Sequence, residues 1–450
     1  MSQNASERGM SARFPRLYPW IVVGILVVIL TSNYLDRTIL ALIIQPLRAD
    51  LKISDTEVSL IGGLAFSVVY TLAGIPVGRI ADLWSRRNLI AIGVCLWSLM
   101  TAICGLTSSF WSLFAARMGF GIGEATMTPS SYSLVSDYFP RERLPRAMSV
   151  YALGIPIGQG LALAFGGWLI HTLTTVAPNV SLPFIGSVRP WQMVFLVIGL
   201  PGLLLVVPAL AIREPVRQGL RREDVHGAPT IGDVLRFLSS HIRIYGSLFC
   251  GVALQTWFSL GAAYWVPTFM VRKHNYSIQE IGLVLGICTV IFGVAGVLTA
   301  GWLSAKFIQY GRRDGPILVG MYYSVGLMVC GIIGCLAPSG LISIVFIGAL
   351  PFFQNTWTPS GGPAALQMIT PNRMRGQISA VYSLVAVIVG GSLGATSMGM
   401  VTDYVFHRDS AVGLSIALVG AITLPLSILI LHVGRKPFRR AIEDEDQSRS

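Results

Sequence analysis

Twelve runs of roughly 20 mainly apolar residues follow one another along the chain, separated by charged or Pro- and Gly-rich segments. A run of that length, folded as a helix, matches the hydrocarbon core of a bilayer. Because hydrophobic residues make up 53% of the chain and charged residues only 12%, an ordinary soluble domain is excluded. The sequence therefore predicts an all-α membrane protein with twelve transmembrane helices. The predicted spans are 19–44, 56–80, 88–108, 110–138, 146–171, 191–212, 243–270, 279–305, 315–337, 340–369, 376–404 and 410–433.

The basic residues predict the orientation of these spans. Most of the 33 Lys and Arg residues lie in the two ends of the chain or in the even-numbered loops. Since cytoplasmic loops carry an excess of Lys and Arg, we expect both termini in the cytoplasm and the spans in the inner, plasma membrane. We expect no removable signal peptide, because the first apolar run is too long for one. The outer loops are left with Arg48, Lys52, Arg189, Arg272, Lys273 and Arg408.

The placement of reactive residues disfavours several other classes of protein. The net charge of +12 is spread among apolar spans, which does not indicate a surface for nucleic acid. The six cysteines fall within the spans and the six histidines fall in loops or at span ends. Neither set suggests a metal site, a redox centre or the nucleophile and base of an enzyme. No phosphate-binding loop occurs, so we expect no nucleotide cofactor.

The sequence also repeats once. The polar segment 213–242 separates six spans from six, which predicts a first half at 1–212, a linker, and a second half with a tail at 243–450. Matching residues, in order, are Ser54 with Ser277, Glu57 with Glu280, Gly78 with Gly301, Pro129 with Pro359 and Tyr151 with Tyr382. Matches in a constant order indicate an ancient duplication, and hence two pseudo-symmetric six-helix bundles.

The loop after the second span carries a recognisable motif. Gly78 and Asp82 are followed by a basic cluster that includes Arg86 and Arg87. This segment resembles the loop signature of the major facilitator superfamily, with Ser85 in place of the usual second glycine. The resemblance implies two six-helix bundles with a binding site between them near the membrane midplane. It also implies that these residues gate the inner side, since a carboxylate can pair with arginines or a helix N-terminus. The simpler interpretation is a solvated turn.

Two further segments narrow the resemblance. Residues 33–37 (Asn-Tyr-Leu-Asp-Arg) and 117–125 (Arg-Met-Gly-Phe-Gly-Ile-Gly-Glu-Ala) are similar to the spinster-like family, and 136–140 strengthens that similarity. The anion:cation symporter family, which moves sugar acids with protons, has similar residues in both spans. The resemblance implies secondary active transport, driven by a proton gradient, of a lipid-like anionic amphiphile such as a sphingolipid or lysophospholipid. The alternatives are a small organic anion such as a sugar acid, or a receptor that kept this fold without transport.

Four ionisable residues lie within the predicted spans: Asp36, Arg37, Arg117 and Glu124. Charges are costly in a bilayer, so they should face an aqueous cavity or one another. Arg117 and Glu124 are two turns apart on one helix face, which predicts that Arg117 is committed to Glu124. Because an arginine partner favours a charged carboxylate and burial favours a protonated one, Asp36, Glu124 and Arg117 are the predicted proton-coupling residues. The structural alternative is a permanent ion-pair network between the two helices.

Arg37 is then left to bind an anionic head group, since a guanidinium can donate two hydrogen bonds to one phosphate or carboxylate. Aromatic and polar residues of the second half are suited to hold an apolar tail, although each alone is also explained as a packing residue. The predicted substrate-binding residues are Arg37, Asn33, Tyr34, Gln255, Trp257, Tyr264, Gln354, Asn355, Trp357 and Thr358. We expect a monomer whose partners are membrane lipids and its substrate.

Overall fold

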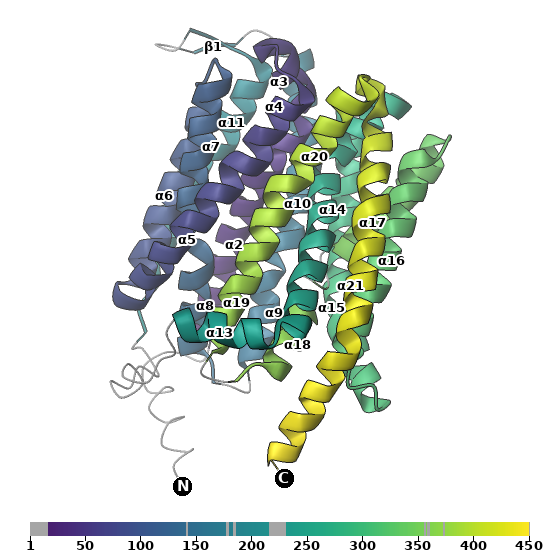
Figure 1. The fold of residues 1–450 in the computed structure, drawn as a ribbon. Helices are drawn as coiled ribbons and strands as arrows, with labels where there is room; N and C mark the ends of the chain where they lie inside the picture. Colours follow the sequence, from purple (N-terminus) through teal and green to yellow (C-terminus); the bar gives the residue numbers. More distant parts are fainter. Residues whose placement is uncertain are drawn as a thin grey trace.

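The computed structural model describes residues 17–140, 143–176, 180–182, 186–215, 231–354, 357, 361–371 and 374–449. These residues are almost entirely helical, and the long helices run side by side in one bundle (Figure 1). This arrangement confirms the predicted all-α membrane fold.

The first half alternates long helices with short irregular turns. Segments η1 and η3 are 3₁₀ turns and η2 is a π-helical turn, so each continues a helix rather than ending it. The helices are α2 (Tyr18–Thr38), η1 (Ile39–Leu42), α3 (Ile44–Leu51), α4 (Asp55–Ser59), η2 (Leu60–Leu64), α5 (Ala65–Leu83), α6 (Arg86–Cys104), α7 (Phe110–Glu124), α8 (Met127–Tyr138), α9 (Leu144–Ala152), α10 (Gly154–Thr175), α11 (Pro190–Gly202), η3 (Leu203–Leu205) and α12 (Val206–Ala211). Strands β1 (Val180–Leu182) and β2 (Gly186–Val188) form an antiparallel hairpin.

The second half follows a short helix, α13 (Ile231–Ser240). Its helices are α14 (Ile242–His274), α15 (Ile278–Gln309), α16 (Gly315–Leu336), α17 (Gly340–Gln354), α18 (Gly362–Ile369), α19 (Arg375–Val385), η6 (Ala386–Leu393), α20 (Gly394–Met400), η7 (Val401–Phe406), η8 (Asp409–Ala411) and α21 (Val412–Arg449). The π-helical segments η6 and η7 keep the eleventh span continuous from α19 to the end of η7.

All twelve predicted spans coincide with helical segments. Among the described residues, nine helices are long and apolar enough to cross a membrane, or ten if α13 and α14 are counted as one span. The other two predicted spans are each made of two shorter helices. The fourth is α7 followed by α8, where Thr128-Pro129-Ser130 makes the second part more polar, and the tenth is α17 followed by α18.

Short elements mark the two ends of the bundle (Figure 1). We call the end at which α2 begins and α21 ends the terminal face, and α13 lies there. We call the opposite end, with α3 and the β1–β2 hairpin, the hairpin face.

The predicted linker 213–242 contains a helix that its polar composition did not indicate. Val234 and Leu238 of α13, one turn apart, are buried, whereas Arg236 is exposed. Because its apolar residues recur at helical spacing, α13 packs on the second half and meets α14 at 96°. Residues 216–230 of the linker lie outside the described residues.

The halves approach each other closely where α10 meets α15. A Cβ atom on Gly160 would lie 2.7 Å from the carbonyl oxygen of Gly286, and one on Gly286 would lie 2.6 Å from that of Gly160. Any side chain at either position would therefore push the two backbones apart. This contact forms one side wall of the space between the halves.

Candidate functional site

A cavity of about 430 Å³ lies between the two halves. Helices α2, α5, α8, α9 and α10 line it from the first half, and α14, α15, α17 and η6 line it from the second. Of the predicted substrate-binding residues, the structure places four on its wall: Tyr34, Arg37, Tyr264 and Gln354. The cavity therefore lies at the junction of the halves, where a ligand contacts both.

Arg37 is the one described residue on the cavity wall that carries a charge. Its side chain is 22% exposed, and its Nη1 atom lies 3.4 Å from Oε1 of Glu124 at the end of α7. The guanidinium also lies 4.3 Å from the centre of the Phe66 ring. An ion pair thus links the first and fourth spans beside the cavity, and part of the guanidinium still faces the open space.

The partner of Glu124 differs from our sequence-based expectation. Among the described residues, Arg117 forms no ion pair, and it is buried with its guanidinium 4.7 Å from the Phe120 ring centre. Seven residues along a helix correspond to about 10.5 Å, and both side chains lean toward the same helix end. Residues on one face at that spacing do not meet, whereas Arg37 reaches Glu124 from the neighbouring helix.

Asp36 is fully buried on the side of α2 away from the cavity. Thr101 of α6 is beside it, and the charges of Arg117 and Glu124 both act on it. In the described part of the chain, no ion pair involves Asp36. Neighbouring residues on a helix point about 100° apart, which explains why Asp36 is buried while Arg37 reaches the cavity. Asn33, one turn earlier, is buried as well.

Besides Asn33, three predicted substrate-binding residues are not on the described cavity wall. Gln255 donates to the carbonyl oxygen of Gly320 at 2.7 Å, within the second half. The indole nitrogens of Trp257 and Trp357 donate to Ser397 Oγ and to the Pro316 carbonyl, each at 2.8 Å. Because these polar groups form hydrogen bonds to neighbouring helices, the three side chains belong to the packing of the second half.

Two further predicted residues, Asn355 and Thr358, lie outside the described residues. The same holds for the side chain of Asp82, the acid of the predicted inner gate. Gly78, one turn earlier on α5, has open space where a Cβ would stand. The prediction for Asp82 therefore stays a prediction.

Arg86 and Arg87 belong to a clasp within the first half. Nε of Arg86 donates to Glu214 at 2.8 Å, and the same guanidinium pairs with Asp137 at the end of α8. Glu214 also accepts from the backbone nitrogen of Arg87 at 3.0 Å and from the Ser85 hydroxyl at 3.0 Å. The carboxylate therefore caps α6 and joins three spans at the terminal face. Sequence analysis missed Glu214, because its partners precede it by some 130 residues.

The second half has a corresponding clasp with the charges exchanged. Nε of Arg435, near the end of the twelfth span, donates to Asp314 at 2.8 Å. Asp314 directly precedes α16, the ninth span, whereas Arg86 is the first residue of α6, the third span. The two clasps thus lie at the start of corresponding spans, with the acid and the base exchanged.

Glu214→Gln is expected to lower the melting temperature in detergent, and the loss should be largest near neutral pH. Burial alone would raise the pKa of Glu214, but hydrogen bonds from the Arg87 amide, the Arg86 guanidinium and the Ser85 hydroxyl hold its pKa below the usual value. A depressed pKa stabilises the fold above the unfolded value and loses that effect as pH falls below roughly 4.3. Wild type and variant should therefore converge in acid. The control is Asp233→Asn, which removes a pair with Arg236 within α13, and a difference that persists in acid would contradict the assignment.

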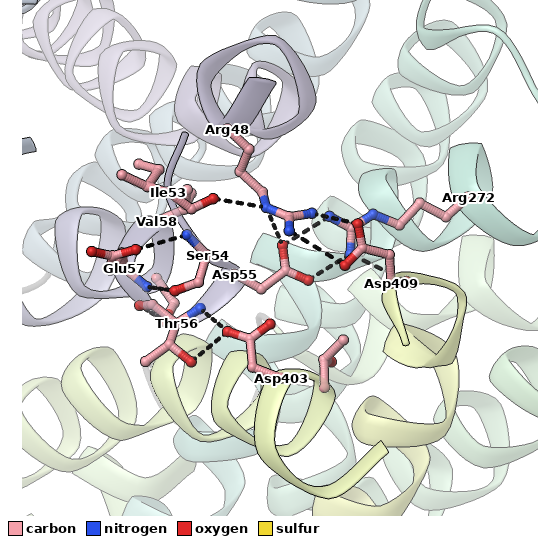
Figure 2. A network of polar contacts seen from close by, with 12 residues as sticks. Arg48, Ile53, Ser54, Asp55, Thr56, Glu57, Val58, Arg272, Asp403 and Asp409 are labelled. Atoms are coloured by element: carbon pink, nitrogen blue, oxygen red, sulfur yellow. Dashed lines mark hydrogen bonds and ion pairs between the residues drawn. The ribbon is translucent and has the colours of Figure 1, made fainter. Parts of the chain in front are cut away.

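At the hairpin face, four charged residues tie the two halves together (Figure 2). We name Arg48, Asp55, Arg272 and Asp409 the hairpin-face latch. Asp55, fully buried at the start of α4, lies 3.1 Å from Nε of Arg48 and 2.5 Å from Nη1 of Arg272. Arg48 also donates to Asp409 at 2.9 Å. Arg272 and Asp409 come from the second half, so each acid has a partner across the junction.

Two further contacts strengthen this closure. Asp403 of η7 accepts from the backbone nitrogen and the hydroxyl of Thr56, each at 2.7 Å, at the N-terminus of α4 (Figure 2). Tyr264 of α14 donates to the carbonyl oxygen of Val58 at 3.0 Å. The cavity is thus closed off by inter-half contacts at the hairpin face.

No signal in the sequence pairs these four residues, so sequence analysis missed the hairpin-face latch. The basic-residue pattern places Arg48 and Arg272 in outer loops and predicts no acidic partner for either. In the structure, hydrogen bonds from Arg48 hold the pKa of Asp409 below its usual value, which keeps the loop acid charged.

Comparison with known proteins identifies the family. Residues 26–395 match the Major Facilitator Superfamily. The chain belongs to this superfamily. Its fold matches the crystal structure of a bacterial homologue of the human lysosomal transporter spinster, described as inward-facing and unoccupied. That match has a TM-score of 0.75 at 22% sequence identity and covers 96% of this chain and 98% of the other.

The relatives that the chain resembles fall into several groups. An MFS-type efflux pump of Mycolicibacterium smegmatis is 27% identical and covers 95% of both chains. The probable galactarate/D-glucarate transporter GudP of Bacillus subtilis is 24% identical, again over 95% of both. Spinster homolog 1 of Xenopus tropicalis is 26% identical over 85% of this chain and 73% of its own length. These are transporters, not enzymes, and both families that the sequence resembles are represented.

Proposed function

We propose that this chain is a proton-coupled secondary transporter of an anionic, lipid-like amphiphile. The observation that supports this most directly is the position of Arg37, the charged residue on the described cavity wall, within 3.4 Å of Glu124. A partly buried guanidinium that faces open space attracts an anion, and the largely apolar wall around it suits a ligand with an apolar part. The major facilitator fold supplies alternating access around a site between two halves.

Proton coupling follows from the competition for Arg37. An anionic ligand on this guanidinium weakens its attraction for Glu124, and a buried carboxylate that loses its partner takes up a proton. Asp36 and Arg117, buried behind α2 and within α7, form a second acid and base pair in electrostatic reach. Substrate binding and proton binding thus favour each other, which is the requirement for symport.

The second candidate is a proton symporter of sugar acids. It is favoured by the similarity to GudP over nearly the whole chain. A sugar-acid carboxylate would use Arg37 in the same way, while its hydroxyl groups would need hydrogen bonds from Gln159, Ser259 and Gln354 on the wall. The two candidates differ in what occupies the apolar part of the cavity.

We further propose that the terminal face is cytoplasmic in the inner membrane and that the protein acts as a monomer. The cavity is closed at the hairpin face, and its wall includes Tyr132, Met148 and Ala152 toward the terminal face. Under this orientation the cavity belongs to an inward-facing state.

Transport into proteoliposomes under an imposed pH difference tests the proposal. We expect uphill accumulation of an anionic lysolipid, its collapse by a protonophore, and none in protein-free liposomes. Accumulation of galactarate with no lysolipid transport would favour the sugar-acid candidate. Absence of both, with ligand binding intact, would favour a receptor and overturn the proposal.

Arg37→Lys is expected to weaken binding of the anion by roughly tenfold although the charge is kept, because an ammonium cannot reproduce the paired hydrogen bonds of a guanidinium. Binding can be measured by calorimetry on purified protein. The control is Arg236→Lys, an exposed arginine on α13. Equal affinity for wild type and Arg37→Lys would remove Arg37 from the binding site.

A further inference from the structure

A second, smaller cavity of about 110 Å³ continues from the central one toward the hairpin face. It lies between α10, α14, α15 and α17, and the two cavities share six wall residues from α2, α10, α14 and α17. We name it the side cavity. Because the shared residues form a junction, a ligand bound beside Arg37 can extend from one cavity into the other.

The junction and the interior of the side cavity differ in polarity. Four of the shared residues are polar: Thr38, Gln159, Ser259 and Gln354. The residues that belong to the side cavity alone are apolar apart from Thr289, and they include Leu163, Val266, Leu285, Ile347 and Leu350. Along the path from Arg37, a ligand thus meets first a cation, then a ring of hydrogen-bonding groups, then an apolar chamber.

We infer that the side cavity binds the hydrocarbon tail of a single-chain amphiphile whose anionic head lies at Arg37. This inference rests on the proposed function and adds the substrate's shape to it. The order of cation, polar ring and apolar chamber matches an anionic head, a hydrogen-bonding linkage and an alkyl chain. Its volume of about 110 Å³ is about a quarter of the 430 Å³ of the central cavity, which favours one hydrocarbon chain over the two chains of a phospholipid.

Ala263 controls entry to the side cavity. It is exposed, it lies on the wall of both cavities, and it is one of the two apolar residues at the junction. A large side chain at this position would fill the passage and leave Arg37 itself unchanged. The hydrocarbon tail would then stop at the junction, while the anionic head group would still bind Arg37.

The test is binding of a series of anionic lysophospholipids with one head group and increasing chain length, by calorimetry on the purified full-length protein. In wild type, each methylene that enters the side cavity should tighten binding about fourfold until a plateau. Ala263→Phe should abolish this dependence and leave the shortest member's affinity within a fewfold. The matched control is Ala152→Phe, which adds the same ring to the central cavity alone and should shift all chain lengths equally.

Leu285→Ala provides an independent variant, since this leucine lines the side cavity alone. Enlarging the chamber should move the plateau to longer chains. If wild type shows the dependence and neither Ala263→Phe nor Leu285→Ala alters it, the tail binds elsewhere and this inference is wrong while the proposed function stands. If wild type binds galactarate but no lysophospholipid, the proposed substrate class is wrong. The inference about the side cavity is then wrong as well, because it rests on that class.

Discussion

Glu124→Gln and Asp36→Asn are each expected to abolish substrate accumulation driven by a pH gradient, a loss of at least tenfold in the accumulation ratio, while the protein remains folded. Each amide keeps the shape of the carboxylate and removes its titration. Glu124 is the partner of Arg37 at the cavity wall, and Asp36 is buried one helix face away. Coupling requires a carboxylate that can leave its arginine partner and take up a proton. Without such a carboxylate, substrate binding and proton binding are no longer linked.

Counterflow distinguishes a loss of coupling from a loss of transport. Proteoliposomes loaded with unlabelled substrate should still exchange it for labelled substrate in both variants, since exchange needs no net proton movement. Glu443→Gln, an exposed change near the end of α21, is the matched control and should accumulate substrate normally. Uphill accumulation by both carboxylate variants would show that protons are coupled through other residues.

The sequence specified the spans because apolar length is a local property. Each run from 19–44 to 410–433 formed helical structure, since a bilayer leaves an apolar chain no other way to satisfy its backbone. The prediction also located the two broken spans, although Thr128-Pro129-Ser130 makes the second part of the fourth more polar. The spans could be predicted because the evidence for each one lies within the span itself.

Side-chain partners were harder to predict, because they depend on how helices rotate against one another. The rule that places Arg117 and Glu124 on one face was correct, yet Glu124 pairs with Arg37, 87 residues away. In the same way Trp257 and Trp357 were assigned to the substrate, but each indole faces a hydrogen-bond acceptor inside the second half. A helix face is predictable from spacing, whereas the neighbour that covers it requires the tertiary structure.

The partners in the hairpin-face latch were the hardest to predict, because they lie furthest apart in the sequence. Arg48 and Asp409 are 361 residues apart, and Asp55 and Arg272 are 217 apart. No pattern in the sequence joins such positions. The duplication does not help either, because it relates each residue to its counterpart in the other half and not to its partner across the junction.

Asp55→Asn is expected to open the hairpin face. Asp55 is fully buried and pairs with arginines from both halves, so its neutral replacement leaves the largely buried Arg272 without its anion and leaves Arg48 with Asp409 alone. Removing one partner of a buried pair costs about 3 kcal/mol or more, and this cost falls only on the closed state, since the same groups are hydrated once the halves separate. A shift of that size changes the ratio of the two states by about a hundredfold.

Distances between spin labels on the hairpin-face ends of α4 and α14 would report this shift, with longer distances expected in Asp55→Asn. The matched control is Asp50→Asn, because Asp50 pairs with Arg189 on the same face but within the first half. Arg272→Gln should open the face as well, and the double variant with Asp55→Asn should be less than additive, because both changes break the same contact. Unchanged distances in Asp55→Asn, or an equal effect of Asp50→Asn, would mean that helix packing alone holds the hairpin face closed. In that event the four charges would serve local stability and the closure would rest on contacts such as Tyr264 with Val58.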